Sequence, residues 1–415
     1  MLKNYIKIAL KVLLRRKFFT FISLFGISFT LLILVVVTSF IDYTFGAVPP
    51  EQKLNRTLSV TMAELRTETD GMWSGPMLSY YFHNKYVKSL KTPEKISISS
   101  FHHPTTTYKD NSKIKMSMKF TDSEFWEILD FEFVEGQGFT KEDVENANRV
   151  AVITRDIQKR YFNDEPCIGK YIEADVDNYR VIGIVENVSI LRIMPYSDIW
   201  VPITCIKEDI HKATIVGNFP SFYSMVLAHD ESDIPKIKEE FRGHIENVEF
   251  PEGRFVKLKT ETSTYGEAMA RTFFRTEQGS VTPVLIVLFV LMVLFMILPT
   301  INLVNINISR IMERSSEIGV RKAFGASSLT LVGQFIVENI IITFIGGAIS
   351  IILSVIVLNI INGSGIIPHT HLGVNFRIFY YSVIICLFFG IFSGVYPAFR
   401  MSRMQPVEAL RGGQS

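Results

Sequence analysis

The chain has 415 residues, of which 48% are hydrophobic and 20% are charged, with a formal net charge of +2. These totals would suit a soluble enzyme, but the apolar residues are gathered into blocks, which excludes a chain that is soluble throughout. The length leaves room for two or three domains. No nucleic-acid partner is expected.

The first 41 residues combine a basic segment with an apolar one. In residues 1–17, Tyr5, Ile8 and Val12 recur at helical spacing with lysines on other faces, which predicts an amphipathic helix on the cytoplasmic leaflet. The alternative is that residues 1–17 form a disordered basic segment before the first span. Residues 18–41 carry no charged side chain and are long enough to cross a hydrocarbon core of about 30 Å. This run is too long for a signal peptide and no small-residue cleavage site follows it, so we expect a retained transmembrane helix.

Residues 42–280 have the composition of a soluble domain inserted after the first span. Strands are predicted at residues 56–62, 95–100, 113–120 and 149–153. Asp122 and Thr154 are predicted to cap helices that end near Leu129 and Phe162. A hairpin over residues 171–185 is predicted to turn at Asp177-Asn178. This mixture indicates an α+β domain without internal repeats.

Further apolar runs follow within residues 281–415. They predict transmembrane helices at residues 282–308, 329–361 and 378–399. Lysine and arginine are concentrated before the first span, between the second and third, and after the fourth, whereas loop 362–375 has none. Because basic flanks stay in the cytoplasm, both termini are predicted to be cytoplasmic. The predicted fold class is a membrane protein with four transmembrane α-helices and a large α+β extracytoplasmic domain between helices 1 and 2.

The sequence offers no convincing catalytic or cofactor site. The nearest match to a phosphate-binding loop, Ile168–Tyr171, lacks the glycine-rich spacing and the hydroxyl residue. Neither His102-His103 nor the pair His369 and His371 has the spacing of a helical metal site. We therefore expect a non-catalytic chain with no metal and no cofactor.

Glu338 is the single acid in the third apolar run. Charged residues inside a membrane are functional candidates, and a structural or coupling role for Glu338 is favoured over proton relay. Cys167 and Cys205 lie in the exported domain and could pair in principle. Isolated thiols in packed positions are the preferred interpretation.

The cytoplasmic segment 309–327 is dense in charge, yet Ile311, Ile318 and Val320 persist within it. A short amphipathic helix here would present apolar side chains framed by both charge signs, which suits docking into a groove of a soluble partner. Gly325 would then let the chain leave the helix in a left-handed conformation. The alternative is a loop that is basic only because it faces the cytoplasm.

Several motifs resemble a known family. The run Glu317–Ser327, followed by Gln334-Phe335 and Glu338, resembles the cytoplasmic loop of MacB/FtsX-type ABC transporter permeases. The C-terminal run Pro406–Arg411 matches the ending of these proteins. In the exported region the resemblance to their periplasmic core domain rests on residues 136–140, 150–153, 168–170 and 179–185.

This resemblance implies the permease subunit of an ABC transporter in the bacterial cytoplasmic (inner) membrane. Such a permease would dimerise with a second copy or a paralogue and bind a separate cytoplasmic ATPase through segment 309–327. The residues matched to this role are Arg314, Ser315, Glu317, Ile318, Gly319, Arg321, Lys322 and Gly325. ATP hydrolysis would drive extracytoplasmic movement that exports or extracts a substrate, with a periplasmic adaptor as a further candidate partner.

Two departures narrow the resemblance, and other functions stay open. Unlike MacB, the chain lacks a fused N-terminal ATPase, and its exported domain is larger than that expected of FtsX itself. A sensor of extracytoplasmic ligands such as antimicrobial peptides shares the topology. A polytopic membrane enzyme would need a convergent acid, base or metal cluster, which the sequence does not supply.

Overall fold

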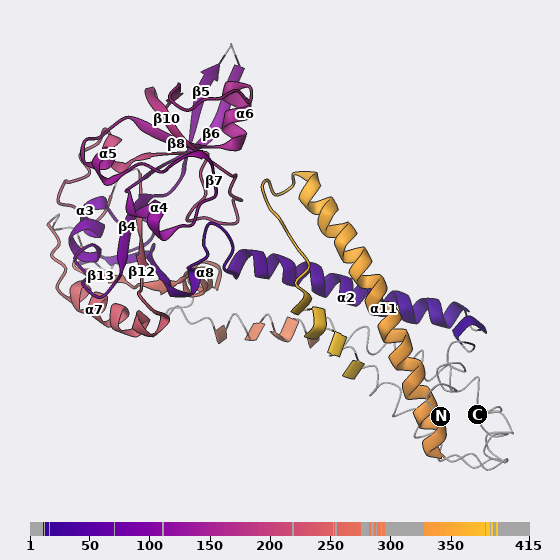
Figure 1. The fold of residues 1–415 in the computed structure, drawn as a ribbon. Helices are drawn as coiled ribbons and strands as arrows, with labels where there is room; N and C mark the ends of the chain where they lie inside the picture. Colours follow the sequence, from indigo (N-terminus) through magenta and orange to yellow (C-terminus); the bar gives the residue numbers. More distant parts are fainter. Residues whose placement is uncertain are drawn as a thin grey trace. The chain divides into compact units, whose positions relative to one another are not determined.

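The structure is a computed structural model, divided into two compact units. The helical unit comprises Met1–Asp42, Leu285–Ile366 and His371–Ser415, and the inserted domain comprises Tyr43–Val284 and Ile367–Thr370 (Figure 1). The residues that the structure describes are 11, 13–15, 17–69, 71–109, 112–217, 220–251, 253, 255–274, 282–283, 286–287, 289–291, 293–294, 328–377, 379–381, 383–384 and 387–388.

The inserted domain is built on a mixed sheet with the strand order β14-β1-β12-β4-β6-β11-β8-β10-β7, to which β5 adds beside β6 and β9 beside β10. The pairs β10/β8 and β11/β6 are parallel, and the other pairs are antiparallel. The strands are β1 (Thr57–Val60), β4 (Lys95–Ser100), β5 (His103–Lys109), β6 (Ser112–Thr121), β7 (Phe133–Gly136), β8 (Val150–Thr154), β9 (Tyr171–Ala174), β10 (Asp177–Val185), β11 (Ile199–Pro202), β12 (Phe222–Leu227) and β14 (Ser263–Thr264).

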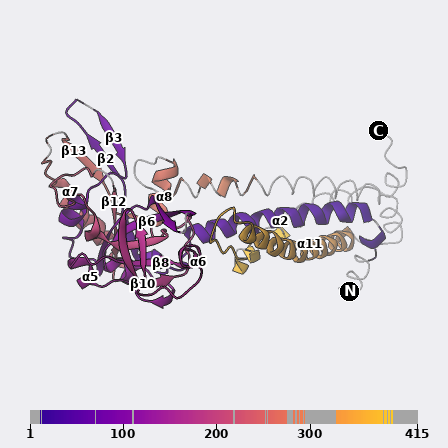
Figure 2. The same cartoon turned by 90° about the horizontal axis from the view of Figure 1, so that it is seen from above.

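A second sheet has three strands in the order β13-β2-β3, and Figure 2 shows it apart from the centre of the large sheet. These strands are β2 (Ala63–Arg66), β3 (Met72–Gly75) and β13 (Lys257–Thr260). The helices of the domain are α3 (Tyr80–Phe82), η2 (His83–Val87), α4 (Glu124–Ile128), α5 (Lys141–Glu145), α6 (Arg155–Phe162), α7 (Ile234–Glu246) and α8 (Tyr265–Phe274), with short turns η1 (Leu54–Arg56), η3 (Ile203–Cys205) and η4 (Glu231–Asp233).

Both faces of the large sheet are buried. Because side chains alternate along a strand, Ile199 and Val201 of β11 join one apolar core while Trp200 joins another. In β8, Ile153 and Val152 divide between the same two cores. Strands buried on both faces carry near-continuous apolar runs. The large α+β domain expected from the sequence is confirmed.

Several local predictions are confirmed. The strands predicted at residues 56–62, 95–100, 113–120 and 149–153 correspond to β1, β4, β6 and β8. Asp122 Oδ1 accepts a hydrogen bond from Phe125 N at 3.2 Å before α4, and Thr154 Oγ1 accepts one from Ile157 N at 3.4 Å at the start of α6. These side chains satisfy main-chain donors that the first helical turn leaves unpaired.

The predicted hairpin forms, but its predicted turn is wrong. Ala174 pairs with Asp177, so the chain turns at Asp175-Val176, where φ is 49° and 68°. Two consecutive positive φ values twist a two-residue turn in the sense that matches the flanking strands. Val176 is a poor residue for such a conformation, which explains why the Asp177-Asn178 pair looked like the better turn.

In the helical unit, α2 (Lys17–Phe45) and α11 (Ser328–Ser364) contact each other through small and apolar side chains. Ser28 Oγ donates to Gly346 O at 3.0 Å, and a Cβ added to Gly346 would lie 2.7 Å from Ile27 Cγ2. Leu31 and Ile342 are buried in the same cluster. Small residues of this kind allow two helix backbones to approach closely.

Two helices within the described residues, Lys17–Phe45 and Ile336–Ser364, are long and apolar enough to cross a membrane. The described residues within 282–294 and 376–388 are helical. The remainder of the predicted second and fourth spans lies outside the described residues, as does most of the predicted amphipathic helix 1–17. The count of four spans therefore stays a prediction.

Candidate functional site

The segment predicted to bind an ATPase, residues 309–327, lies outside the described residues. The structure therefore places none of Arg314, Ser315, Glu317, Ile318, Gly319, Arg321, Lys322 or Gly325. Glu338 is described: it is fully buried in α11 next to the buried Asn339 and takes part in at least one polar or electrostatic interaction. Its coupling role stays a prediction.

The inserted domain contains an ion pair that is removed from solvent. Arg192 Nη1 donates to Glu51 Oε2 at 3.0 Å, and the two side chains are only 1% and 4% exposed. Arg192 Nη2 donates to Gly46 O at 2.7 Å, and its guanidinium carbon lies 5.5 Å from the centre of the Tyr43 ring. One arginine thus holds two points of the segment that continues from α2.

Lys119 of β6 lies fully buried close to this pair. Its Nζ donates to Met194 O and, at 3.1 Å, to Tyr223 Oη, while Tyr223 Oη donates to Met194 O at 2.6 Å. Burial lowers the pKa of Lys119 to about 7, although the carboxylate of Glu51 opposes the shift. Burial also raises the pKa of Glu51, against the influence of Arg192 and Lys119. Together Glu51, Lys119, Arg192 and Tyr223 form what we call the charge centre.

The loop of residues 188–198, which carries Arg192 and Met194, is hydrogen-bonded to three other segments of the inserted domain: the segment after α2, the start of α8, and Ile367–Thr370. Arg192 binds the segment after α2, as described. Tyr265 Oη, at the start of α8, donates to Leu191 O at 3.3 Å, and Ser189 Oγ and Thr370 Oγ1 share a hydrogen bond of 2.9 Å.

The third of these segments, Ile367–Thr370, belongs to the inserted domain although the chain on both sides of it belongs to the helical unit. Thr370 is buried, and the main-chain oxygen of the adjacent His369 accepts a 3.4 Å contact from Tyr43 Oη. The loop 188–198 and Tyr43 therefore tie together chain segments that are far apart in the sequence.

The chemistry of the charge centre suits anchoring. Breaking a buried, hydrogen-bonded ion pair leaves an uncompensated charge and typically costs about 3–5 kcal/mol, so the segment after α2 resists separation from the loop 188–198. The start of α8 and Thr370 are joined to the same loop by neutral hydrogen bonds. Among the described residues no group of three or more His, Cys, Asp or Glu side chains could hold a metal ion. Cys167 and Cys205 are free thiols, the first buried and the second partly exposed.

Sequence reasoning did not find the charge centre. Lys119 continues the spacing of the exposed lysines Lys113 and Lys115 along β6, so its type and position predict a solvated side chain. The loop 188–198, Tyr223 of β12 and Phe125 of α4 lie against Lys119 and together bury it. Glu51 and Arg192 lie 141 residues apart, and nothing in their local sequence marks them as partners.

Comparison with protein families gives two matches that together cover most of the chain. Residues 20–244 match the MacB-like periplasmic core domain. Residues 289–406 match the FtsX-like permease C-terminal domain. The first match alone spans more than half of the 415 residues.

The relatives with curated descriptions are distant. An uncharacterized ABC transporter permease of Bacillus subtilis, YknZ, is 22% identical over 66% of this chain and 65% of its own length. The macrolide export ATP-binding/permease protein MacB of Bdellovibrio bacteriovorus is 25% identical over 66% of this chain and 41% of its own length. The matched part of this chain thus spans less than two thirds of these relatives.

Solved structures resemble the chain only in part. The extracellular domain of the noncanonic ABC-type transporter YknZ from Gram-positive bacteria is 17% identical and covers 49% of this chain and 98% of its own, with a TM-score of 0.37. The periplasmic region of MacB from Actinobacillus actinomycetemcomitans is 13% identical. It covers 53% of this chain and 94% of its own, with a TM-score of 0.35. These scores are too low to add to the description of the fold. On the two family matches, the chain belongs to the MacB/FtsX family of ABC transporter permeases.

Proposed function

We propose that the protein is the permease subunit of an ABC transporter in a bacterial cytoplasmic membrane and acts by transmitting movement. A separate cytoplasmic ATPase would bind residues 309–327, and its ATP-driven closure would move the helical unit. The inserted domain, outside the membrane, would export or extract the substrate. The proposed protein has four spans with both termini in the cytoplasm. It forms a dimer with a second copy or a paralogue. A periplasmic adaptor is a candidate partner.

The observation that best supports transmission is the loop 188–198. It bonds to the segment after α2, to the start of α8 and to Thr370. The segment after α2 and Ile367–Thr370 adjoin the helical unit along the chain, and the start of α8 lies 20 residues before Leu285, where the chain enters that unit again. A displacement of the segment after α2 would act on this loop, because a buried ion pair is costly to break. The start of α8 and Thr370 are hydrogen-bonded to the same loop. Transmission needs such a stiff connection.

The ATPase part of the proposal is tested by charge reversal in residues 309–327. The variants Glu317→Lys and Arg321→Glu are expected to abolish co-purification of an ATPase from the native host while membrane insertion is retained. The matched control is Lys113→Glu, a reversal at an exposed lysine of the inserted domain. Unchanged ATPase recovery with both loop variants would count against the proposed docking segment.

The transmission part is tested at the charge centre. In the reconstituted complex, Glu51→Gln together with Arg192→Met is expected to leave ATP hydrolysis in place while transport falls, because the loop 188–198 no longer holds the segment after α2. A variant that loses hydrolysis and transport equally would indicate that the charge centre serves assembly and not transmission.

A further inference from the structure

Three segments of the inserted domain meet beside the end of α2. Residues 43–50 include the last turn of this helix, which ends at Phe45. The loop 188–198 is bonded to them through Arg192 and to residues 367–370 through Ser189. Residues 367–370 follow α11, which ends at Ser364. Residues 43–50 and 367–370 therefore lie within six residues of the ends of two helices that are apolar enough to cross a membrane.

The exposed surface of these three segments is apolar. Within them Arg192 is buried, and Asp198 and His369 are half-buried. Ile190 and Ile193 keep 49% and 36% of their area exposed. The exposed residues of the three segments, which we call the apolar rim, are Phe45, Ala47, Pro49, Ile190, Ile193 and Pro368. Each lies within three positions of a residue that bonds one segment to another, so the rim belongs to one connected part of the domain.

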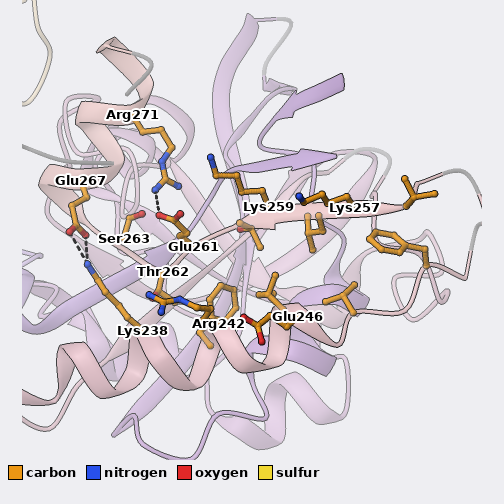
Figure 3. A pocket seen from close by; sticks show the side chains of 17 residues that line it. Lys238, Arg242, Glu246, Lys257, Lys259, Glu261, Thr262, Ser263, Glu267 and Arg271 are labelled. Carbon is orange, nitrogen blue, oxygen red and sulfur yellow. Dashed lines mark hydrogen bonds and ion pairs between the residues drawn. The ribbon is translucent and has the colours of Figure 1, made fainter. Parts of the chain in front are cut away.

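Other surfaces of the same domain carry charge. The groove between α7 and β13 is lined by side chains of both signs, among them Lys238, Glu261 and Arg271 (Figure 3). Strand β6 exposes Lys113 and Lys115. Single exposed apolar residues are normal on a protein surface, but a connected surface that exposes neither a charge nor a hydroxyl group indicates contact with something other than water.

The length of α2 indicates that this contact is the lipid bilayer. The charge-free run 18–41 is about 36 Å long at 1.5 Å per residue, slightly more than a hydrocarbon core of about 30 Å. Gly46 follows Ile41 by five residues, about 7 Å of helix, and one headgroup layer is about 5–8 Å thick. The rim therefore begins at the level of the headgroups. A protein partner fits less well, because protein interfaces include hydrogen bonds and the side chains of the rim have no donor or acceptor.

We propose that the apolar rim contacts the lipid bilayer, with Ile190 and Ile193 inserted among the headgroups of the leaflet from which α2 emerges. Apolar faces of interfacial segments lie about 5–10 Å deep in this boundary. The two isoleucines flank Leu191 and Arg192, and the bonds of Arg192 to Glu51 and Gly46 O fix the loop beside the end of α2. The loop 188–198 thereby joins the inserted domain to the membrane surface. This inference rests on α2 crossing the membrane, and not on ATPase binding or on export of a substrate.

The test measures the surroundings of a nitroxide label on the full chain in nanodiscs of phosphatidylethanolamine and phosphatidylglycerol. Cys167, Cys205 and Cys386 are replaced by alanine, and the label is attached in turn to Ile190→Cys and Ile193→Cys. Power saturation then compares collisions with oxygen, which concentrates in lipid, and with a nickel chelate, which stays in water. The ratio of oxygen to nickel collisions is expected to be about tenfold higher at both positions than at a label in water, because an apolar phase excludes the polar chelate.

Two reference positions calibrate this ratio. Phe29→Cys reports lipid, since Phe29 lies half-way along the charge-free run of α2 and is 49% exposed. Val176→Cys reports water: Val176 is 83% exposed and precedes β10, whose length of about 26 Å at 3.3 Å per residue separates it from the loop 188–198. A ratio at positions 190 and 193 equal to that at 176 would overturn the proposal. Few collisions with either reagent would show that protein covers the loop, and would equally contradict contact with lipid.

A further variant tests whether the two isoleucines insert together. With the label at position 193, Ile190→Asp is expected to lower the ratio about threefold, because a carboxylate does not leave water without a partner, whereas Ile190→Val should preserve it. Val176→Asp is the matched control and should leave the ratio at position 193 unchanged. The label at position 29 reports in each variant whether α2 is still inserted. An unchanged ratio at position 193 in Ile190→Asp would contradict insertion of the loop.

Discussion

In the inserted domain, charged side chains hold distant segments together. In the helical unit, α2 and α11 meet through Ile27, Leu31 and Ile342, with one bond from Ser28 Oγ to Gly346 O. The helical unit also buries one acid, Glu338, but the charge centre of the inserted domain excludes solvent from three charged side chains, Arg192, Glu51 and Lys119. A lipid bilayer penalises buried charge heavily, whereas a folded domain surrounded by water can supply carbonyl groups and a counter-ion to each charge.

This difference has a mechanical consequence. Helices that meet mainly through apolar contacts can slide by small steps at the loss of few hydrogen bonds. The loop 188–198 has no such freedom, because a shift of Arg192 would break its hydrogen bonds to the Glu51 carboxylate and to Gly46 O. We expect the helical unit to be the compliant region and the charge centre to be the stiff one.

The largest effect is expected at Arg192. Arg192→Met leaves the Glu51 carboxyl buried without its partner and should lower the free energy of unfolding by about 3–5 kcal/mol. Urea unfolding can be followed by the fluorescence of Trp200, which is buried in the core of the inserted domain, and of Trp126, which packs against that core. Adding Glu51→Gln should recover part of the loss. A loss below about 1 kcal/mol, the size typical of an exposed pair, would remove the distinction between the two regions.

The next effect is a pH dependence at Lys119. Its pKa of about 7 in the folded domain is below the ordinary value of 10.5, so the unfolded chain binds more protons between these values. The free energy of unfolding should therefore rise with pH from about 7 towards 10.5, by at most about 1.4 kcal/mol per pH unit from this group. Lys119→Met should lack this contribution. Parallel stability curves for the two proteins between pH 7 and 9 would contradict burial of a titrating lysine.

A smaller loss is expected in the helical unit at Gly346. Gly346→Ala places a methyl group 2.7 Å from Ile27 Cγ2 and should cost about 1–3 kcal/mol by overpacking, seen as a lower melting temperature in detergent. Gly333→Ala is the control in the same helix, since a Cβ there meets no atom of the described residues within 4 Å. It should be neutral or slightly stabilising. Equal melting temperatures for the two variants would show that the packing of α2 against α11 does not require a close approach of the two backbones at Gly346.

The smallest effect is expected from a half-buried ion pair between α7 and α8. Lys238 Nζ contacts both oxygens of Glu267 at 2.7 Å, with side chains 30% and 26% exposed. Solvent screens such a pair, so Lys238→Met should cost less than about 1 kcal/mol. High salt should shrink the difference between wild type and variant in the urea experiment. A cost comparable to that of Arg192→Met would mean that pairing geometry outweighs burial in this domain.

Local patterns predicted a good part of the fold. The apolar and alternating runs of β4, β6 and β8 were recognisable because side-chain period alone fixes such strands. Thr154 was recognisable as a cap because it is followed by a helical run. The turn at Asp175-Val176 was not, because strand register overrode the turn preference of the residues that follow. The three-stranded sheet was missed, since β13 is separated from β2 by almost 200 residues.

By itself, the sequence determined the apolar blocks, the α+β character of the inserted domain and the motifs that place the chain in its family. All of these depend on neighbouring residues and on the partition of side chains between water and an apolar phase. The tertiary structure alone decided which charges are buried. Lys119 and Lys113 are the same residue type on the same strand, yet one lies beneath the loop 188–198 and the other faces solvent. Burial of a charge depends on what covers it, and here the covering loop lies more than 70 residues away along the chain.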